Sequence, residues 1–290
     1  MTERTSNRIF DTVNVILLAI FVLICLAPFF HIVAISLSST RAVVSGAVTL
    51  LPIDLDLRAY RSVLSDTSMI RSLGFTVFLT VLTTVLCMIM TVAAAYPLTH
   101  TKLKGRKVFM FIIVVTMFFS GGIIPEYILV QNLHLLNTVW ALVLPGLISP
   151  FYLIILISFF NGIPNSLVEA AEIDGATQFG TLFKIILPLS LPVIATLSLF
   201  YAVGRWNGFQ DSLLYITKTE LYPLQLKLYQ LVQNSMISDV TRNEGPGVLH
   251  STPESLKAAS VVFATVPILL VYPWLQRYFV SGVMLGAVKG

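Results

Sequence analysis

Long apolar stretches without a charged residue constrain this chain more than any other feature of its sequence. A helix needs about 20 apolar residues to cross the roughly 30 Å of hydrocarbon in a bilayer. The window between Asp11 and Arg41 and the window between Arg71 and Lys102 both exceed that length and contain no Lys, Arg, Asp or Glu. With 56% hydrophobic and 11% charged residues, the chain has too much apolar surface for one water-soluble core. The sequence therefore predicts an all-α membrane protein.

We expect six transmembrane helices in a single membrane domain that covers residues 1–290. The first is interpreted as an uncleaved span, because its apolar core is too long for the h-region of a signal peptide. The expected spans cover about 12–37, 72–98, 108–130, 138–160, 186–209 and 259–278.

The short loop between the second and third spans sets the expected orientation. It carries Lys102, Lys104, Arg106 and Lys107, and short loops rich in Lys and Arg stay on the cytoplasmic side. This places both termini and residues 161–188 in the cytoplasm. The net charge of +4 comes from scattered cations, so we read it as a topology signal and expect no nucleic-acid partner.

An acidic, polar segment lies between the fourth and fifth spans. Ser166, followed three residues later by Glu169, has the spacing of a capping box that begins a helix. Gly175 is expected to end this helix after about two turns, because glycine readily takes the left-handed conformation of a helix end. A second helix is expected from about residue 176 until Pro188 breaks or kinks it. The pattern alone fits both a capped helix at the membrane surface and a docking site for a basic partner.

Residue for residue, this segment resembles the cytoplasmic signature of the permease subunits of binding-protein-dependent ABC importers. The signature reads Glu-Ala-Ala, three residues, Gly, nine residues, Ile, one residue, Leu-Pro, and it is matched here by Glu169, Ala170, Ala171, Gly175, Ile185, Leu187 and Pro188. The resemblance implies a type I importer permease fold. It also implies that the short helix is a coupling helix, which inserts into a cleft of a separate ATPase subunit.

The resemblance further implies a role for each residue of the coupling loop, 161–188. Glu169 would pair with a cation of the ATPase and Gly175 would set the bend. Phe179, Leu182 and Phe183 would pack the loop under the membrane helices. The expected coupling residues are Ser166, Glu169, Ala170, Ala171, Asp174, Gly175, Ala176, Phe179, Phe183, Leu187 and Pro188.

Three further segments narrow the resemblance to the sugar-importer branch. Residues 119–125, 201–207 and 276–290 are similar to the second permease of transporters for maltose, complex oligosaccharides and uronates, such as alginate or pectin fragments. The implied cargo is therefore an oligosaccharide. By the same resemblance the C-terminal tail would reach between two ATPases, with Gly286, Ala287, Val288, Lys289 and Gly290 as its last residues.

Polar residues in or beside the apolar spans are candidates for a substrate path, because such groups are costly in a membrane. Glu126 follows a Gly-Gly and Pro pattern that is typical of broken helices at binding sites. Arg205 fits snorkelling to the interface as well as it fits a path. The aromatic candidates fit stacking on sugar rings or an interfacial belt. The expected path residues are Glu126, Tyr127, Trp206, Asn207, Gln210 and Asp211, with His31 as a further intramembrane polar group.

No catalytic or metal-binding pattern is present among the four His and two Cys, and there is no phosphate-binding Gly-x-x-x-x-Gly-Lys-Ser/Thr loop. The resemblance implies that ATP and Mg²⁺ bind to two partner ATPase subunits and that this chain is not itself an enzyme. It also implies a second, homologous permease and an extracytoplasmic solute-binding protein, in a bacterial inner or plasma membrane. A self-contained secondary transporter is the alternative, but Glu126 is the one intramembrane acid available to couple an ion gradient.

One outer segment carries a helical pattern outside the spans. Leu224, Leu228, Leu231 and Val232 recur at helical spacing and predict an amphipathic helix on the membrane or on a partner. A solvated loop remains the alternative.

Overall fold

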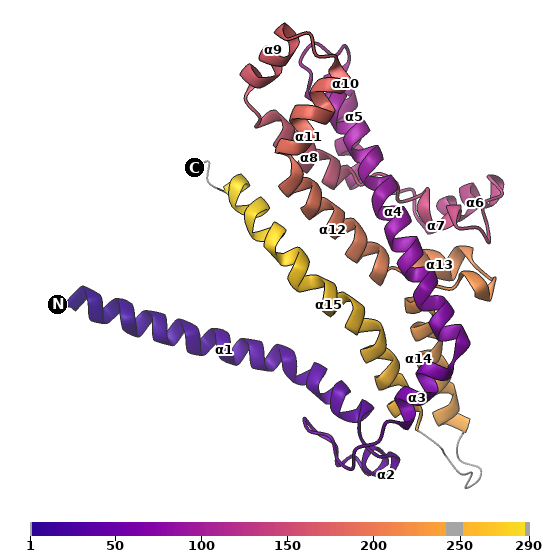
Figure 1. Cartoon of the computed structure of the whole chain (residues 1–290). Coiled ribbons are helices and arrows are strands. Elements are labelled where there is room, and N and C mark those ends of the chain that lie inside the picture. The colour runs from indigo at the N-terminus through magenta and orange to yellow at the C-terminus, as the bar shows by residue number, and fades with distance from the viewer. Residues whose placement is uncertain (1, 242–251, 288–290) are drawn as a thin grey trace. The chain divides into compact units, whose positions relative to one another are not determined.

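The computed structural model describes the backbone of residues 2–241 and 252–287 and the side chains of 10–234 and 252–271. All regular structure in these residues is helical, and they contain no strand (Figure 1). The chain divides into two compact units, which are described separately. One comprises Met1–Ile70 with Lys227–Val266, and the other comprises Arg71–Leu226 with Pro267–Gly290.

The first unit contains α1 (Thr2–Ser36), α2 (Thr40–Val44), α3 (Arg58–Ser65) and most of α14 (Leu224–Thr241). The second unit contains most of α4 (Thr67–Thr99), and α15 (Pro253–Ala287) belongs to both units. The remaining helices of the second unit are α5 (Arg106–Phe118), α6 (Ile123–Asn132), α7 (Trp140–Val143), α8 (Pro150–Asn161), α9 (Asn165–Ile173), α10 (Gln178–Thr181), the π-helical η1 (Leu182–Ile186), α11 (Leu187–Leu189), α12 (Leu191–Asn207), α13 (Gln210–Tyr215) and the 3₁₀ turn η2 (Thr219–Leu221).

Among the described residues, three unbroken helices are long and apolar enough to cross a membrane, and three bent pairs raise the number to six if each pair is one span. The unbroken ones are Phe10–Ser36, Thr67–Thr99 and Pro253–Val271, which overlap the first, second and sixth predicted spans. The bent pairs are Arg106–Phe118 with Ile123–Asn132 (114°), Pro150–Asn161 with Asn165–Ile173 (70°) and Gln178–Leu189 with Leu191–Asn207 (80°).

The fourth predicted span, 138–160, is not one continuous helix. Residues 144–149 separate α7 from α8, and they include Pro145 and Gly146, which disfavour helix. α8 restarts with the Ser149 side chain accepting the Tyr152 N–H at 3.5 Å and with Pro150 at its start. The apolar pattern locates the segment, but the two helix-breaking residues inside it divide the helix.

The main core of the second unit lies between α4, α8 and α12. Leu156 and Leu197 are fully buried there, together with Cys87 and Ala95 of α4. A buried hydroxyl joins the three segments, because the Tyr201 hydroxyl lies 2.9 Å from the Thr91 hydroxyl and accepts the Ser149 N–H at 3.1 Å. This hydrogen bonding satisfies polar groups that would be costly to leave unpaired in this core.

The predicted amphipathic helix around residues 224–232 is confirmed as α14. Leu224 and Leu228 are buried, whereas Leu231 and Val232 are half-buried. The alternative of a solvated loop is therefore excluded for this segment.

Candidate coupling loop and polar cavity

The C-terminus of α9 ends in a hydrogen-bonded glycine turn. Gly175 has a φ of +79°, in the left-handed region that glycine adopts without strain. The N–H of Ala176 donates to the carbonyl of Ala171 at 2.9 Å, and the N–H of Gly175 donates to the carbonyl of Glu172 at 3.1 Å. These two bonds define a Schellman motif. The predicted helix end at Gly175 is therefore confirmed.

The N-terminus of α9 differs from the prediction. Pro164 is the residue that precedes the first helical turn, and no side chain caps it. Ser166 lies inside the helix, which begins at Asn165, so the capping box that was predicted for Ser166 and Glu169 is not formed. The fixed φ of proline already suits a helix start, and the N-cap position lies two residues earlier than the predicted cap at Ser166.

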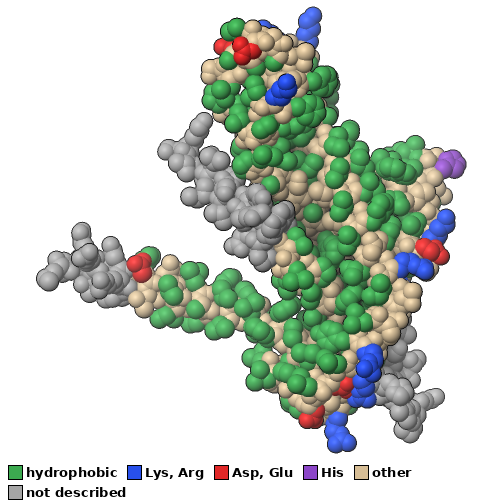
Figure 2. All heavy atoms as spheres, in the orientation of Figure 1, with side chains coloured by type: hydrophobic (Ala, Val, Ile, Leu, Met, Phe, Trp, Pro, Cys, Tyr) green, Lys and Arg blue, Asp and Glu red, His purple; other side chains and the backbone are tan. Residues whose placement is uncertain are grey.

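The acidic face of α9 is open. Glu169, Glu172 and Asp174 are exposed, and Figure 2 shows a red cluster at the α9 end beside a largely green surface. The two alanines differ, because Ala171 is 7% exposed and packs inward, whereas Ala170 is exposed. Of the two alanines in the signature, only Ala170 is thus accessible to a partner.

The second helix of the loop runs two residues further than predicted. It passes through Pro188 and breaks at Ser190, where the chain bends by 80° before α12. A π-helical turn precedes the proline, with the Leu187 N–H donating to the Leu182 carbonyl. Because this turn has already shifted the hydrogen-bond pattern, Pro188 lies at the start of a new short helical segment and does not break the helix.

The three apolar residues of this helix have different environments. Leu182 is 6% exposed in the main core, as predicted, but Phe179 and Phe183 are 75% and 63% exposed. They lie four residues apart on one helical face, away from the face that Leu182 and Ile186 bury. Both phenylalanines line an apolar groove of about 880 Å³ beside the end of α4. The prediction that they pack the loop is therefore wrong within this chain.

A polar cavity of about 620 Å³ collects four of the six expected path residues. Glu126, Asn207, Gln210 and Asp211 line it, although they come from α6, the end of α12 and α13. The other two lie elsewhere, because Trp206 is buried and Tyr127 stacks on Tyr215 with ring centroids 6.2 Å apart; neither lines the cavity. The cavity wall also includes Thr83, Tyr152, Tyr201 and Arg205.

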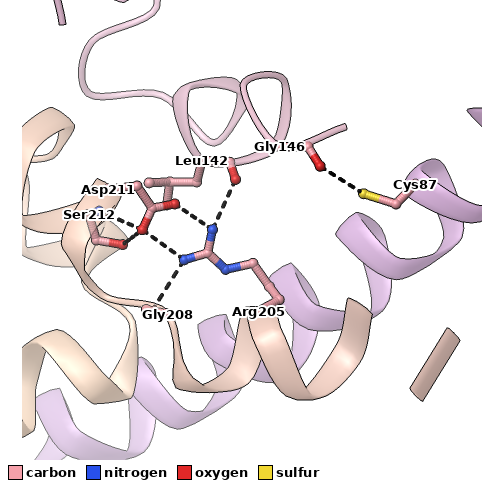
Figure 3. A network of polar contacts seen from close by, with 7 residues as sticks. All are labelled: Cys87, Leu142, Gly146, Arg205, Gly208, Asp211 and Ser212. Carbon is pink, nitrogen blue, oxygen red and sulfur yellow. Dashed lines mark hydrogen bonds and ion pairs between the residues drawn. The ribbon is translucent and has the colours of Figure 1, made fainter. Parts of the chain in front are cut away.

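An ion pair fixes one wall of this cavity (Figure 3). Asp211 accepts two hydrogen bonds from the Arg205 guanidinium, at 2.5 and 2.9 Å. The same guanidinium donates to the carbonyls of Leu142 at 3.0 Å and Gly208 at 3.3 Å. The Arg205 side chain is 9% exposed. Snorkelling, which the sequence also fitted, is therefore excluded for Arg205.

The carboxylates of the cavity also act on a neighbouring phenol. Burial raises the pKa of the Tyr215 hydroxyl above its ordinary value of 10.0, and the charges of Glu126 and Asp211 raise it further. Tyr215 therefore stays a neutral hydrogen-bond donor in the cavity wall.

The sequence also singled out His31 and the C-terminal tail, in addition to the loop and the cavity described above. A ring nitrogen of His31 lies 2.6 Å from the Thr49 carbonyl in the first unit. Gly286 and Ala287 continue α15, whereas Val288, Lys289 and Gly290 lie outside the described residues. The tail's role therefore stays a prediction. Within the described part of the chain, no group of three or more His, Cys, Asp or Glu is placed to hold a metal ion.

The sequence left Arg205 open between snorkelling and a path, and sequence reasoning missed its ion pair with Asp211. Its partner Asp211 lies six residues away, beyond the end of α12, so the helical i, i+3 and i, i+4 rules do not pair them. One signal of this pairing was available in the sequence: Arg205 and Asp211 have opposite charges and lie on either side of a break at Gly208.

Comparison with known proteins agrees with this geometry. Over 98% of its length the chain is 44% identical to the full length of the polygalacturonan/rhamnogalacturonan transport system permease protein YtcP of Bacillus subtilis. It is 41% identical to the protein LplC of the same organism, over the whole chain and 98% of that protein. In structure it matches a chain of a bacterial ABC transporter involved in the import of the acidic polysaccharide alginate, with a TM-score of 0.85 and 35% identity over 94% of this chain and 98% of that one.

The profile of one protein family covers most of the chain. It matches residues 79–284, which include α9, the bend at Ser190 and the polar cavity. The predicted type I importer permease fold is therefore confirmed, and a self-contained secondary transporter is not favoured. The chain belongs to the family of binding-protein-dependent transport system inner membrane components.

Proposed function

We propose that this chain is one of two permeases of an importer for acidic oligosaccharides, and that α9 docks onto a cytoplasmic ATPase. The observation that carries the docking role is the form of α9, a short helix with an open acidic face and a glycine-locked end. Exposed carboxylates on a helix suit a basic cleft on a partner. The locked end keeps the helix at a defined angle to α10.

The ATPase activity belongs to the partner subunits, since the sequence of this chain has no phosphate-binding loop. Closure of two ATPases would carry α9 with it and rock the bundle between inward-open and outward-open states. The charge of the loop at 99–107 supports cytoplasmic termini and a cytoplasmic α9. The C-terminal tail, ending in Val288, Lys289 and Gly290, is proposed to reach the ATPases. An extracytoplasmic binding protein would deliver the sugar to the opposite side.

Two relatives support the choice of an acidic oligosaccharide. One is a polygalacturonan/rhamnogalacturonan transport system permease, and the other belongs to a transporter involved in the import of alginate. The polar cavity supports a sugar for a chemical reason. Asn207, Gln210 and Glu126 offer amide and carboxylate groups suited to sugar hydroxyls, and Tyr152 adds an aromatic ring. Arg205 is neutralised by Asp211, so we assign this wall to hydroxyl recognition and not to the sugar carboxylates.

The docking role is tested in the complete importer with Glu169→Lys and Gly175→Pro. Each variant is expected to lose most ATPase chain on purification and most uptake, while the permease still inserts in the membrane. Glu220→Lys reverses an exposed charge outside the loop, and Gly46→Pro strains another positive-φ glycine; both should keep the ATPase. Normal uptake and normal ATPase content in both loop variants would refute the docking role.

The cargo is tested in proteoliposomes that contain the complete importer and its binding protein. Oligogalacturonate or oligoalginate is expected to raise ATP turnover several-fold over basal turnover, whereas maltotriose is not. Stimulation by maltotriose alone would show that the cargo is neutral and refute the acidic class.

A further inference from the structure

A hydrogen-bonded cluster joins the coupling loop to the cytoplasmic end of α4, and no feature of the sequence indicated it. We name it the α4–α10 clamp; it consists of Tyr96, His100, Glu172 and Gln178. Tyr96 lies in the last turn of α4, and His100 follows its last residue. Gln178 begins α10 and Glu172 belongs to α9. The two sides of the clamp are thus far apart in the sequence, and Tyr96 and Gln178 are separated by 82 residues.

The Gln178 side-chain amide is the centre of the clamp. Its Nε2 donates to the Glu172 carboxylate at 3.2 Å. Its Oε1 accepts from the Tyr96 hydroxyl at 3.1 Å and lies 2.9 Å from His100 Nε2. Glu172 fixes this orientation, because a carboxylate only accepts hydrogen bonds and would repel the amide oxygen. His100 Nε2 must therefore be a donor.

Two further contacts hold the α4 side of the clamp. The Tyr96 hydroxyl shares its one hydrogen between Gln178 Oε1 and the Gln178 backbone carbonyl, which also lies 3.1 Å away. The Tyr96 and His100 rings meet edge to face, with centroids 4.8 Å apart. The groove in front of the clamp is apolar, and Leu182 and Ile186 share the main core with α4, so the clamp adds polar contacts to an otherwise apolar contact between the loop and α4.

We propose that His100 and Gln178 are positioning residues that transmit movement of α9 to α4. This inference rests on the docking role of α9 proposed above. The covalent path from α9 to α4 runs through the whole of α5 to α8, whereas the clamp connects them through one amide. Without the clamp, the ATPase still docks on α9, but its movement reaches α4 less completely.

The test compares His100→Ala and Gln178→Ala in the reconstituted importer, with Thr101→Ala as the control at an exposed neighbouring residue. Both clamp variants are expected to retain the ATPase chains. Uptake should fall about three- to tenfold, the effect of losing one or two hydrogen bonds, and ATP consumed per sugar should rise. Wild-type uptake with a wild-type ATP-to-sugar ratio would overturn the inference. Loss of the ATPase chains from either variant would overturn it as well, since the residues would then serve docking.

A reciprocal exchange keeps the inference testable if the alanine variants fold poorly. Gln178→Glu places two carboxylates together and should uncouple the importer. Gln178→Glu combined with Glu172→Gln restores an amide facing a carboxylate, and the carboxylate introduced at position 178 can accept from Tyr96 and His100. Because Glu172 also belongs to the acidic face of α9, Glu172→Gln alone measures what the loss of this carboxylate costs, and the double variant should transport better than the product of the two single effects. A double variant that shows only the product of the two single effects would overturn the clamp.

The outcomes separate the two proposals. If Glu169→Lys and Gly175→Pro transport normally, the docking role fails. If these two lose the ATPase while His100→Ala and Gln178→Ala behave as wild type, the clamp alone fails.

Discussion

Removing Asp211 should destabilise the protein through the charge that it leaves behind. Asp211→Ala deprives the 9%-exposed Arg205 side chain of its carboxylate. Breaking a buried ion pair from one side costs about 3–5 kcal/mol. The Asp211 side chain is 30% exposed, and Arg205 keeps its bonds to the Leu142 and Gly208 carbonyls. We therefore expect a loss of about 2–3 kcal/mol, or about 3–5 °C in apparent Tm.

The chain carries its own probe for this measurement. Of its two cysteines, Cys87 is fully buried and Cys25 is exposed. In a Cys25→Ser background, a thiol-reactive dye reports the temperature at which the protein opens around Cys87. The unfolding curve of the detergent-solubilised permease then gives the apparent Tm of each variant.

Two comparisons decide whether the buried charge is the cause. Asp56→Ala breaks an ion pair of similar length, but its partner Arg58 is 56% exposed, so the Tm should hardly change. Replacing both partners, with Arg205→Met and Asp211→Leu, removes the charge and should recover most of the loss. A double variant as unstable as the single one, or an Asp211→Ala variant with unchanged Tm, would refute the reasoning.

The other predictions concern a turn, the core and a buried thiol. Gly175→Ala should weaken binding of the ATPase chain about fivefold, because a side chain costs about 1 kcal/mol in the left-handed region. The control Gly74→Ala adds a Cβ to open space in a helix and should not weaken it. Equal affinity of both variants for the ATPase chain would contradict this prediction. Leu197→Ala should cost about 2–5 kcal/mol, because this side chain is 0% exposed in the core, and an unchanged Tm would contradict it. Cys87 should resist a small, membrane-permeant maleimide in the folded, detergent-solubilised protein and react once the protein is unfolded, because its side chain is 0% exposed, and mass spectrometry of labelled peptides would check this.

The membrane class and the glycine-ended helix could be predicted from the sequence, because each depends on local properties. Charge-free length predicts a span, and Gly175 predicts a left-handed turn whatever surrounds it. The same holds for α14, whose apolar spacing is a property of one helix.

The predictions that failed concerned features that depend on neighbouring residues or on tertiary contacts. Ser166 satisfied the spacing of a capping box, but Pro164 began the helix earlier. The pairing of Arg205 with Asp211 required the chain direction after Gly208, which no periodic pattern gives. The clamp of His100 and Gln178 depends on tertiary packing between segments nearly 80 residues apart. Such contacts leave no spacing rule in a single sequence.

The π-helical turn Leu182–Ile186 helps to set the direction in which the preceding part of the loop, including α9, projects. A π turn carries one residue more than the α geometry around it. Deleting one residue there would restore ordinary α-helix and rotate the preceding segment by about 100° relative to α11. α9 would then face a different direction, with every one of its side chains intact. The direction of the proposed docking helix is thus set by the helical phase of five residues, and we expect a length change of one residue there to lower uptake more than most single substitutions on α9.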